Sequence, residues 1–405
     1  MIKNIKVLFL CGFFAKENEN EVLKQAKGRV EYSANIFQEK LIKGLQKSNV
    51  IYEVISAPFI GSYPNRSFWR KFKGFSATQN QCSYVSFNNI WGFRNVSRAK
   101  SLKKAVKHFI EENIANKLII VYSVHTPFLE AAVYAKKKDP RIKICLIVPD
   151  LPQYMNLSKK VSLIYRLGKK YDIKRFYRLN RFVDSYMLLT EQMTEKIDVR
   201  HKPYMVVEGI IDSNVFDENE RLKQTLKKDN YLKYIVYTGA MNQKYGIVNL
   251  VEAFEKLSGE HYRLVLCGKG DLDQYVREKA TEDTRILVLG QVTAETAHEW
   301  MLRADILVNP REGNEEYTQY SFPSKDIEYL TTGNPVIANV LNGMSNKYFQ
   351  FVYTIQDNLD KLMRELLILR KDNKTKFEMF KSYALENLTE EIVVKKIFSI
   401  SGISK

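Results

Sequence analysis

The sequence lacks the features that mark a secreted, zinc-binding or membrane-spanning protein. Its four cysteines are scattered and form no CxxC pair, so we expect buried free thiols rather than disulfides or a zinc site. No run approaches the roughly 18 uninterrupted apolar residues of a membrane span. The apolar residues 7–14 are followed at once by Lys16-Glu-Asn-Glu19, with no small-residue cleavage site, so they predict a buried strand instead of a signal peptide.

Tandem repeats, low-complexity tracts and Gly/Ser-rich linkers are also absent. The composition, 45% apolar and 27% charged residues, is typical of a soluble globular enzyme. A chain of 405 residues exceeds the size at which a single hydrophobic core stops growing. We therefore expect two domains and a cytoplasmic location.

Positive charge is strongly asymmetric along the chain. Residues 1–200 contain 36 Lys and Arg against 16 Asp and Glu, a difference of +20, whereas residues 201–405 contain 27 against 30, a difference of −3. The whole excess of the formal charge of +17 lies in the first half. A one-sided excess indicates that this half faces an anionic partner such as nucleic acid, lipid headgroups or a phosphorylated substrate.

Short apolar runs alternate with amphipathic helical stretches in both halves. Runs that are apolar on both faces are what parallel strands covered by helices require, so the pattern predicts an α/β fold with parallel sheets. The expected strands are residues 7–10, 51–55, 118–122, 142–148 and 185–189 in the first half, and 205–207, 234–237, 263–267, 286–289, 306–308 and 335–338 in the second.

Two Rossmann-like, doubly wound domains are the predicted architecture. The first covers residues 1–200 and the second residues 201–380, with a boundary near Arg200-His-Lys-Pro203. Residues 381–405 are expected to form a helix that crosses back to the first domain. Ligands of such sheets bind outside the carboxyl ends of the strands, so we expect the site in the cleft where two such edges face each other.

The strongest motif covers residues 320–328, where a strand and a polar loop lead into a helix. The free N–H groups of that helix start offer an anion site, to which Lys325 adds charge. Glu328, one turn into the helix, is placed to accept hydrogen bonds from ribose hydroxyls. A capped helix with Glu328 in a surface salt bridge explains the same pattern. In the first interpretation, the segment supplies Tyr320, Ser321, Phe322, Pro323, Ser324, Lys325 and Glu328.

This motif resembles the donor-binding signature of glycosyltransferase family 4, which has the GT-B fold of two facing Rossmann-like domains. Glu328 matches the second glutamate of the family's Glu-x7-Glu pair, and Tyr320 stands at the position of the first. The Tyr-Ser-Phe-Pro-Ser-Lys form is similar to that of bacterial members that build capsular or other surface polysaccharides. The resemblance implies a donor-binding second domain, an acceptor-side first domain, and Lys325 and Glu328 among the catalytic residues.

Two further segments resemble parts of the family's donor site. Gly239 lets the backbone approach a phosphate because it has no Cβ, and Lys244 and Arg311 are expected to neutralise the diphosphate. Ala240 stands where the family has an arginine, and a solvated loop lysine is the plain alternative for Lys244. The remaining implied contacts, near the nucleotide and its base, are Gly268, Gly270 and Val292. Asp271-Leu-Asp273 mimics a metal-binding DxD motif but is interpreted as a helix start, so no metal and no cofactor are expected.

On the acceptor side, the resemblance points to Tyr32 and Asn35 at a helix start and to His125 and Asp150 at two strand ends. Pro149 replaces the histidine of the family's His-Asp pair. His125 and Asp150 are candidates for a catalytic contact with the sugar or the acceptor. Both residues are also common as loop-capping side chains.

Two stretches combine cations with aromatic residues, one at residues 66–75 and one at residues 159–182. Such stretches suit an anionic membrane interface or RNA stacking, and a core-facing helix with a solvated basic face is the structural alternative. Together with the charge of the first half, they lead us to predict peripheral contact with the inner face of the cell membrane.

The resulting hypothesis is a retaining glycosyltransferase. It moves a sugar from a nucleoside-diphosphate sugar, UDP-linked by preference, to a hydroxyl of a lipid-linked or oligosaccharide acceptor, without nucleic acid as a partner. A GT-B nucleotide-sugar epimerase, a basic nucleic-acid-binding protein and a non-catalytic partner subunit are the alternatives. The tyrosine at 320 and the alanine at 240 motivate the last of these.

Overall fold

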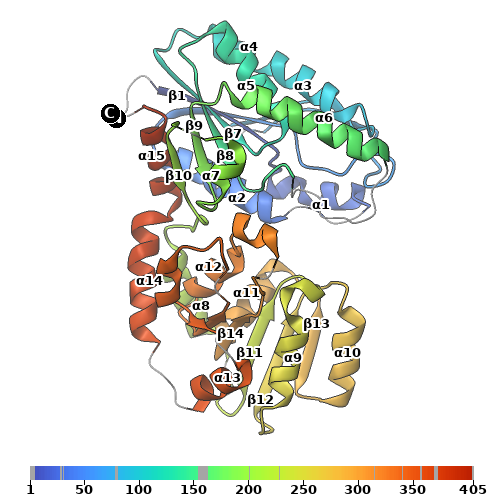
Figure 1. Ribbon diagram of the computed structural model, residues 1–405, viewed down its shortest axis with the longest axis vertical. Helices are drawn as coiled ribbons and strands as arrows, with labels where there is room; N and C mark the ends of the chain where they lie inside the picture. The colour runs from blue at the N-terminus through green and yellow to red at the C-terminus, as the bar shows by residue number, and fades with distance from the viewer. Residues whose placement is uncertain are drawn as a thin grey trace. The chain divides into compact units, whose positions relative to one another are not determined.

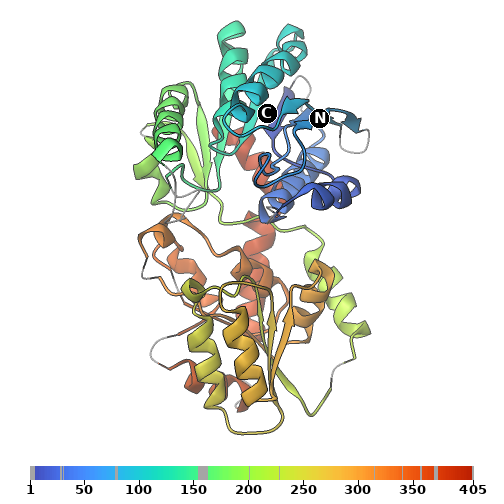
Figure 2. The same cartoon turned by 90° about the vertical axis from the view of Figure 1, so that its right-hand side faces the viewer.

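The computed structural model describes residues 5–27, 30, 32–77, 81–153, 163–199, 201–227, 229–313, 315–339, 341–355, 358–368 and 373–403. The chain forms two compact units, drawn in Figures 1 and 2. Unit 1 comprises Met1–Ile211 and Leu388–Lys405, and unit 2 comprises Asp212–Asn387. The sequence placed these divisions at 200 and 380. Residues 204–206 belong to unit 1 because they form the edge strand of its sheet.

The described part of unit 1 contains an eight-stranded sheet in the order β10-β9-β8-β7-β1-β2-β5-β4. Neighbouring strands are parallel except for the antiparallel pair β4–β5. The strand order reverses beside β1, between β1 and β7, which is the switch point of a doubly wound sheet. The strands are β1 Ile5–Cys11, β2 Ile51–Ser56, β4 Ser76–Ala77, β5 Cys82–Tyr84, β7 Asn116–Tyr122, β8 Lys143–Val148, β9 Ser185–Leu188 and β10 Tyr204–Val206.

Helices cover this sheet, and a small antiparallel ribbon of β3 (Lys71–Phe72) and β6 (Phe87–Asn88) lies beside it. Helix α5 packs against α3, α6 and the strands β1, β7 and β8, and Figure 1 shows α3, α5 and α6 together on one side of the sheet. The helices are α1 Lys16–Gln25, α2 Tyr32–Lys47, α3 Arg94–Ala105, α4 Lys107–Glu111, α5 Thr126–Lys138, α6 Leu163–Asn180, α7 Met193–Ile197 and α15 Glu390–Ile400.

The C-terminal helix α15 is part of unit 1. It packs on α2 so closely that a Cβ on Gly44 would lie 2.3 Å from the backbone oxygen of Glu390. Lys47 forms an ion pair with the Glu390 carboxylate, and the hydroxyls of Ser185 and Ser401 lie 2.9 Å apart. The end of the chain is thereby fixed to the first unit.

The described part of unit 2 contains a parallel sheet in the order β13-β12-β11-β14-β15-β16. The strand order reverses between β11 and β14. The strands are β11 Lys233–Thr238, β12 Tyr262–Cys267, β13 Ile286–Gly290, β14 Ile306–Asn309, β15 Val336–Ala338 and β16 Tyr353–Thr354. The α-helices are α8 Val215–Thr225, α9 Ile247–Glu255, α10 Asp273–Glu282, α11 Ala294–Arg303, α12 Ser324–Thr331, α13 Leu359–Ile368 and α14 Lys374–Asn387, and the 3-10 helices are η1 Gln243–Tyr245, η2 Glu316–Tyr320 and η3 Asn346–Gln350.

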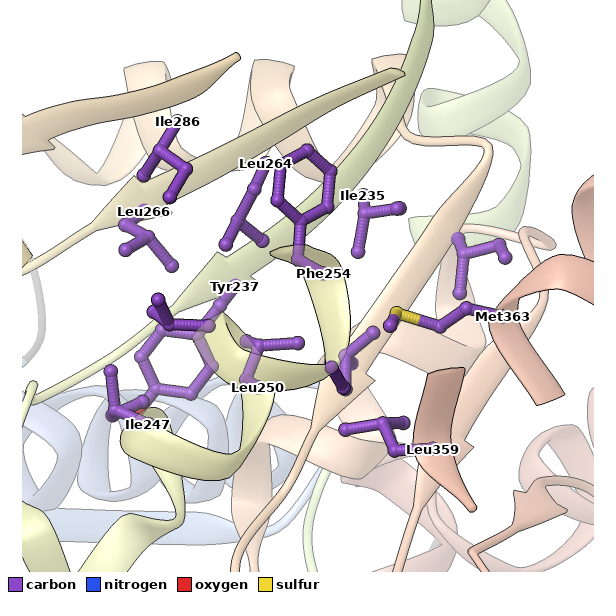
Figure 3. Close-up of a cluster of buried hydrophobic side chains, with 14 of the residues drawn as sticks. Ile235, Tyr237, Ile247, Leu250, Phe254, Leu264, Leu266, Ile286, Leu359 and Met363 are labelled. Atoms are coloured by element: carbon purple, nitrogen blue, oxygen red, sulfur yellow. The ribbon is translucent and has the colours of Figure 1, made fainter. Parts of the chain in front are cut away.

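The core of unit 2 lies between one face of this sheet and the helices α9 and α13. Strand residues such as Ile235 and Leu264 meet Phe254 of α9 and Met363 of α13, as Figure 3 shows. Figure 2 shows α9 and α10 running across one face of the sheet. Because apolar residues occupy both faces of the strands, each sheet has to be covered by helices on both sides.

The predicted fold class, α/β with parallel, doubly wound sheets in two domains, is confirmed. All four cysteines, Cys11, Cys82, Cys145 and Cys267, are free and buried, as expected. Within the described residues, no helix is both long enough and apolar enough to span a membrane.

Candidate functional site

The loops that follow β11, β12 and β13 meet at the carboxyl edge of the unit 2 sheet through their backbones. Gly239 N–H donates to Cys267 O at 2.8 Å, and Gly268 N–H donates to Gly290 O at 2.7 Å. Gly268 has a φ of +145°, and a Cβ there would lie 1.7 Å from Gly239 O. Only glycine permits this approach, so the predicted pair Gly239 and Gly268 is brought together at the edge.

The loop after β14 joins the same network. Gly246 has a φ of +73°, and a Cβ on it would lie 2.2 Å from Pro310 O. The backbone oxygen of Met241 lies equally close to the Cβ position of Gly270. The edge is therefore built by backbone contacts across the switch point, and Val292 follows two residues after β13 with a partly exposed side chain.

At the switch point, Lys244 and Arg311 share two tyrosine rings. Lys244 Nζ lies 5.1 Å from the ring centre of Tyr245 and 5.6 Å from that of Tyr317. The Arg311 guanidinium lies 5.6 Å and 5.4 Å from the same two centres. Its Nη2 donates to Ser321 Oγ at 3.3 Å, whereas its buried Nε has no hydrogen-bond partner. Two cations are thus held together by aromatic faces, which attract cations without neutralising them.

Sequence reasoning named Lys244, Arg311 and Ser321 but missed Tyr245 and Tyr317. The signal was present, because Tyr245 directly follows Lys244 and Tyr317 lies in the loop between Arg311 and the predicted helix. Aromatic rings beside two expected phosphate-binding cations are candidates for cation–π support. The structure joins all five side chains into one group.

The first half of the 320–328 motif is packed inward. Tyr320 ends η2 and is 5% exposed, and the ring centre of Phe322 lies 5.0 Å from that of Tyr348. Ser324 is the first residue of α12, and Pro323 occupies the N-cap position without a side-chain cap. Proline fixes φ near the helical value, so it sets the entry of the chain into α12.

The second half of the motif exposes an ion pair. Lys325 Nζ donates to Glu328 Oε2 at 2.6 Å, with the side chains 38% and 42% exposed. Burial raises the pKa of the Cys267 thiol to about 11, against the opposing effect of the Lys325 charge. An exposed pair of this kind contributes about 0–1 kcal/mol. Both side chains can therefore exchange this partner for a ligand at little cost.

Sequence reasoning missed Asp326, which is fully buried in the first turn of α12. Asn309 Nδ2 donates to its Oδ1 at 2.5 Å, and its Oδ2 makes no hydrogen bond. Burial raises the pKa of this carboxyl to about 7, with Asn309 and Arg311 opposing the shift. Asp326 lies three and four residues before Tyr329 and Leu330, on the apolar face of the helix, and this spacing is the signal that predicts burial.

Tyr329, also not anticipated, fastens α12 to the end of β11. Its hydroxyl accepts from Thr238 N–H at 2.8 Å and donates to Thr238 O at 3.2 Å. Burial raises the pKa of this hydroxyl. The helix that carries Lys325 and Glu328 is thus held against the strand that precedes Gly239.

In unit 1, Tyr32 and Asn35 both have intramolecular partners. The Asn35 amide accepts from Phe14 N–H and donates to Phe14 O, each at 2.9 Å. Burial and a hydrogen bond to Glu19 raise the pKa of the Tyr32 hydroxyl to about 12. Asn35 therefore fixes the loop that follows β1, and the acceptor role of both residues stays a prediction.

His125 and Asp150 follow the neighbouring strands β7 and β8. The His125 ring packs against Phe59 and Phe128, with ring centres 5.7 Å away in both cases, and its Nδ1 is buried without a partner. Burial, with the charges of Arg98 and Arg94, holds the pKa of His125 well below its usual value, so the ring is neutral near pH 7. Asp150 is exposed.

The two basic-aromatic stretches differ in their packing. In the first, Phe72 lies between Trp69 and Phe87, with ring centres 5.5 Å and 5.3 Å away. In the second, residues 154–162 lie outside the described residues. The described part of α6 buries Phe176 and exposes Tyr171. Membrane contact through these stretches stays a prediction.

A metal site has one candidate group among the described residues. Ligand atoms of Glu53, His108 and Glu112 lie within 4.8 Å of one another. The Lys6 ammonium forms ion pairs with both carboxylates, so a cation of the protein already balances their negative charge. In the sequence motif that mimics DxD, Asp271 accepts from Gln243 N–H, and Asp273 forms an ion pair with Arg277.

Known proteins resemble this chain in the sequence of one segment and in the overall fold. Residues 232–372 match the family described as Glycosyl transferases group 1. No curated protein has a sequence that matches the chain.

Solved structures resemble the chain over almost its whole length. A glycosyltransferase from Rickettsia africae shares 13% identity at a TM-score of 0.63, covering 98% of each chain. HepE from Anabaena in complex with UDP-glucose shares 13% identity at a TM-score of 0.59, covering 97% of this chain and 98% of that one. The apo form of the lipopolysaccharide outer core galactosyltransferase WaaB shares 13% identity at a TM-score of 0.59, covering 98% of each. The chain has the GT-B fold, and its residues 232–372 match the group 1 glycosyl transferases.

Proposed function

We propose that the chain is a retaining glycosyltransferase of family 4 that uses a UDP-sugar and a lipid-linked glycan acceptor in bacterial capsule or surface polysaccharide synthesis. The observation that carries the proposal is the cation pair Lys244 and Arg311 at the switch point of the sheet whose residues match the group 1 family. HepE, which shares the fold, is described with UDP-glucose, and WaaB is described as a lipopolysaccharide galactosyltransferase. These descriptions support the donor and the acceptor class.

The cation pair and the start of α12 are the groups that bind the donor diphosphate in this proposal. When the bond from the anomeric carbon to the diphosphate oxygen breaks, negative charge grows on the diphosphate. Lys244, Arg311 and the N–H groups of α12 stabilise that charge more in the transition state than in the ground state, which lowers the barrier. Arg311 also retains an Nε that is buried without a hydrogen-bond partner.

Retention follows if the acceptor hydroxyl attacks from the face that the diphosphate leaves. The new bond joins the acceptor oxygen to the anomeric carbon, and the hydroxyl proton passes to an oxygen of the departing diphosphate. The chain then needs no general base. Glu328 binds the ribose hydroxyls and Lys325 turns from Glu328 to the diphosphate, while His125 and Asp150 contact the sugar or the acceptor.

The proposal includes neither a metal nor another cofactor, because Lys244, Arg311 and Lys325 supply the positive charge that a metal would supply. It places the protein at the inner face of the cell membrane, with the basic first half, of net charge +20, toward the lipid. Removing divalent cations with EDTA is expected to leave UDP-sugar binding unchanged within about twofold.

A thermal-shift panel of UDP-, GDP-, ADP- and dTDP-sugars tests the donor assignment. We expect UDP-sugars to raise the unfolding temperature by several degrees, since a ligand that binds only the folded state stabilises it. A panel in which no nucleotide sugar shifts the transition contradicts the proposal. Product analysis with a nucleotide sugar alone separates transfer from epimerisation.

Glu328→Gln tests the role of the exposed carboxylate. The change is expected to lower kcat/KM for transfer about 100-fold or more, because a hydrogen-bonded charge is lost from the bound donor. The matched control is Glu278→Gln, an exposed glutamate on α10 of the same unit, which should stay within about twofold. Equal rates for both variants rule out a donor contact by Glu328.

A further inference from the structure

The start of α3 in unit 1 gathers cations that no carboxylate of the described residues neutralises. Arg94 and Arg98 are the first and fifth residues of this helix. Arg98 is 1% exposed, and its Nη2 donates to Pro58 O at 2.5 Å while its Nε has no partner. Arg94 Nη1 donates to Ile60 O at 3.0 Å. Among the described residues, neither guanidinium forms an ion pair, whereas Lys103, near the other end of α3, pairs with Glu130 at 3.3 Å.

The charges of this group act on one another. The pKa of Arg94 is lowered mainly by burial and further by the charge of Arg66. The pKa of Arg98 is lowered mainly by burial and further by the charge of Arg94. Burial and the charges of both arginines lower the pKa of His125. Its ring packs on Phe59, the residue after the Pro58 that Arg98 holds. The Arg98 guanidinium also lies 4.3 Å from the ring centre of Phe87, a contact that attracts the cation without cancelling its charge.

The helix end adds to this positive potential. The first turn of α3 contains no acidic residue, and its N-cap residue, Phe93, provides no side-chain hydrogen bond. Cations at a helix N-terminus oppose the helix dipole, which favours anions there. A buried guanidinium without a counter-ion is costly to a fold, and an anion bound beside it would remove that cost. The arrangement therefore selects a ligand with negative charge.

Exposed apolar side chains surround this helix start. Trp91 is 50% exposed, Phe93 70% and Val96 62%, and all three lie within three residues of Arg94. Figure 1 shows α3 beside α5 in the upper part of unit 1. Large exposed apolar groups next to uncompensated cations fit a ligand that joins an anionic group to an apolar chain.

We propose that Arg94, Arg98 and His125 bind the phosphate or diphosphate of an amphiphilic acceptor, and that Trp91, Phe93 and Val96 hold its apolar chain. The inference rests on the proposed function only in identifying this ligand as the acceptor substrate. The site itself rests on the buried, unpaired guanidinium and its apolar surroundings.

Titration calorimetry of farnesyl diphosphate binding to the full chain tests this site. We expect Arg94→Gln, which keeps a donor for Ile60 O, to raise the Kd at least tenfold. The matched control is Lys100→Gln, which removes an exposed charge from the same helix and should stay within twofold. Farnesol and inorganic diphosphate should each bind at least tenfold more weakly than farnesyl diphosphate, because each fills one half of the site.

Phe93→Ala keeps the test decisive if Arg94→Gln does not fold. It should weaken farnesyl diphosphate about fivefold and leave inorganic diphosphate unchanged. Equal affinities of Arg94→Gln and Lys100→Gln for farnesyl diphosphate overturn the proposal. So does a result in which Arg94→Gln reduces only binding to phosphatidylglycerol vesicles, since the arginines then contact a membrane headgroup.

Stabilisation by UDP-glucose, measured on the same samples, separates this inference from the proposed function. Stabilisation without binding of farnesyl diphosphate overturns the site alone. Binding of farnesyl diphosphate that depends on Arg94, without any effect of a nucleotide sugar, supports the site and contradicts the proposed function.

Discussion

The carboxyl edges of the two sheets have the same topology but are built by different means. Both reverse strand order beside their first strand. In unit 2 the loops meet backbone to backbone, as when Gly239 N–H donates to Cys267 O. In unit 1 side chains do this work: the Gln38 amide accepts from Gly12 N–H at 2.7 Å, and Asn35 holds the backbone of Phe14. Glycine loops leave the neighbouring cations of unit 2 available to a ligand, whereas the amides of unit 1 are already used.

Each edge also buries one group of opposite charge with an unpaired atom. Unit 1 buries the Arg98 guanidinium with an unpaired Nε, and unit 2 buries the Asp326 carboxyl with an unpaired Oδ2. A guanidinium stays charged at any ordinary pH, but a carboxyl whose pKa is about 7 can escape the cost of burial by taking up a proton. The comparison therefore predicts that the edge of unit 2 responds to pH near neutrality through Asp326.

The largest expected effect is that of Gly268→Ala, which attacks the backbone contact in unit 2. The new Cβ would meet Gly239 O at 1.7 Å in a backbone conformation that disfavours side chains, so we expect a loss of about 4 kcal/mol or more. Gly92→Ala in unit 1 is the matched control, since Gly92 has a φ of +85° with nothing within 4 Å of the Cβ position. Its cost is expected to be about 1 kcal/mol. Urea unfolding measures both, and equal losses would contradict the contact.

The second prediction concerns the buried acid. Burial raises the pKa of Asp326 from 3.8 to about 7, so the folded protein holds this proton more tightly than the unfolded chain. Its contribution to stability is complete below pH 3.8 and is lost as the pH rises to about 7. Between pH 5 and pH 8 the wild type should lose about 2–3 kcal/mol more than Asp326→Asn.

The control for this change is Asp217→Asn, which alters an exposed acid in the same unit. Urea unfolding at the two pH values measures the difference. If Asp326→Asn and the wild type lose stability in parallel, the carboxyl is not titrating in this range.

The smallest expected effect compares two tyrosine hydroxyls. Tyr329→Phe removes the bonds to both backbone groups of Thr238 and leaves them without that partner, which should cost about 2 kcal/mol. Tyr84→Phe in unit 1 removes the 3.1 Å bond that its hydroxyl accepts from Ala15 N–H, at a cost of about 1 kcal/mol. Chemical denaturation of both variants checks the order, and a larger loss at Tyr84 would reverse the comparison.

Much of the fold was predictable because it depends on local patterns. Runs such as residues 118–122 and 263–267 are apolar on both faces, and they became β7 and β12 of two parallel sheets. The end of unit 1 was less predictable. Residues 204–206 were assigned to the second series, and only the pairing of β10 with β9 assigns them to the first.

Residues of the candidate site that belong to a sequence motif were predictable. Residues that matter only through their contacts in the folded protein were not. Lys244 and Arg311 were named as phosphate-neutralising cations from the resemblance, but the rings of Tyr245 and Tyr317 that contact both of them were not. Arg98 was missed because its charge pattern is that of any basic helix. Its importance comes from a burial that only packing against Pro58 and Phe87 produces.

By itself the sequence determined the alternation of strands and helices, the surplus of positive charge in the first half and the glycines that let loops approach. These depend on neighbouring residues and on the φ angles that each residue type allows. Only the tertiary structure decided which charges are buried without a partner. Arg98 and Asp326 meet their surroundings through residues distant in the chain, and the cost of a charge depends on what surrounds it.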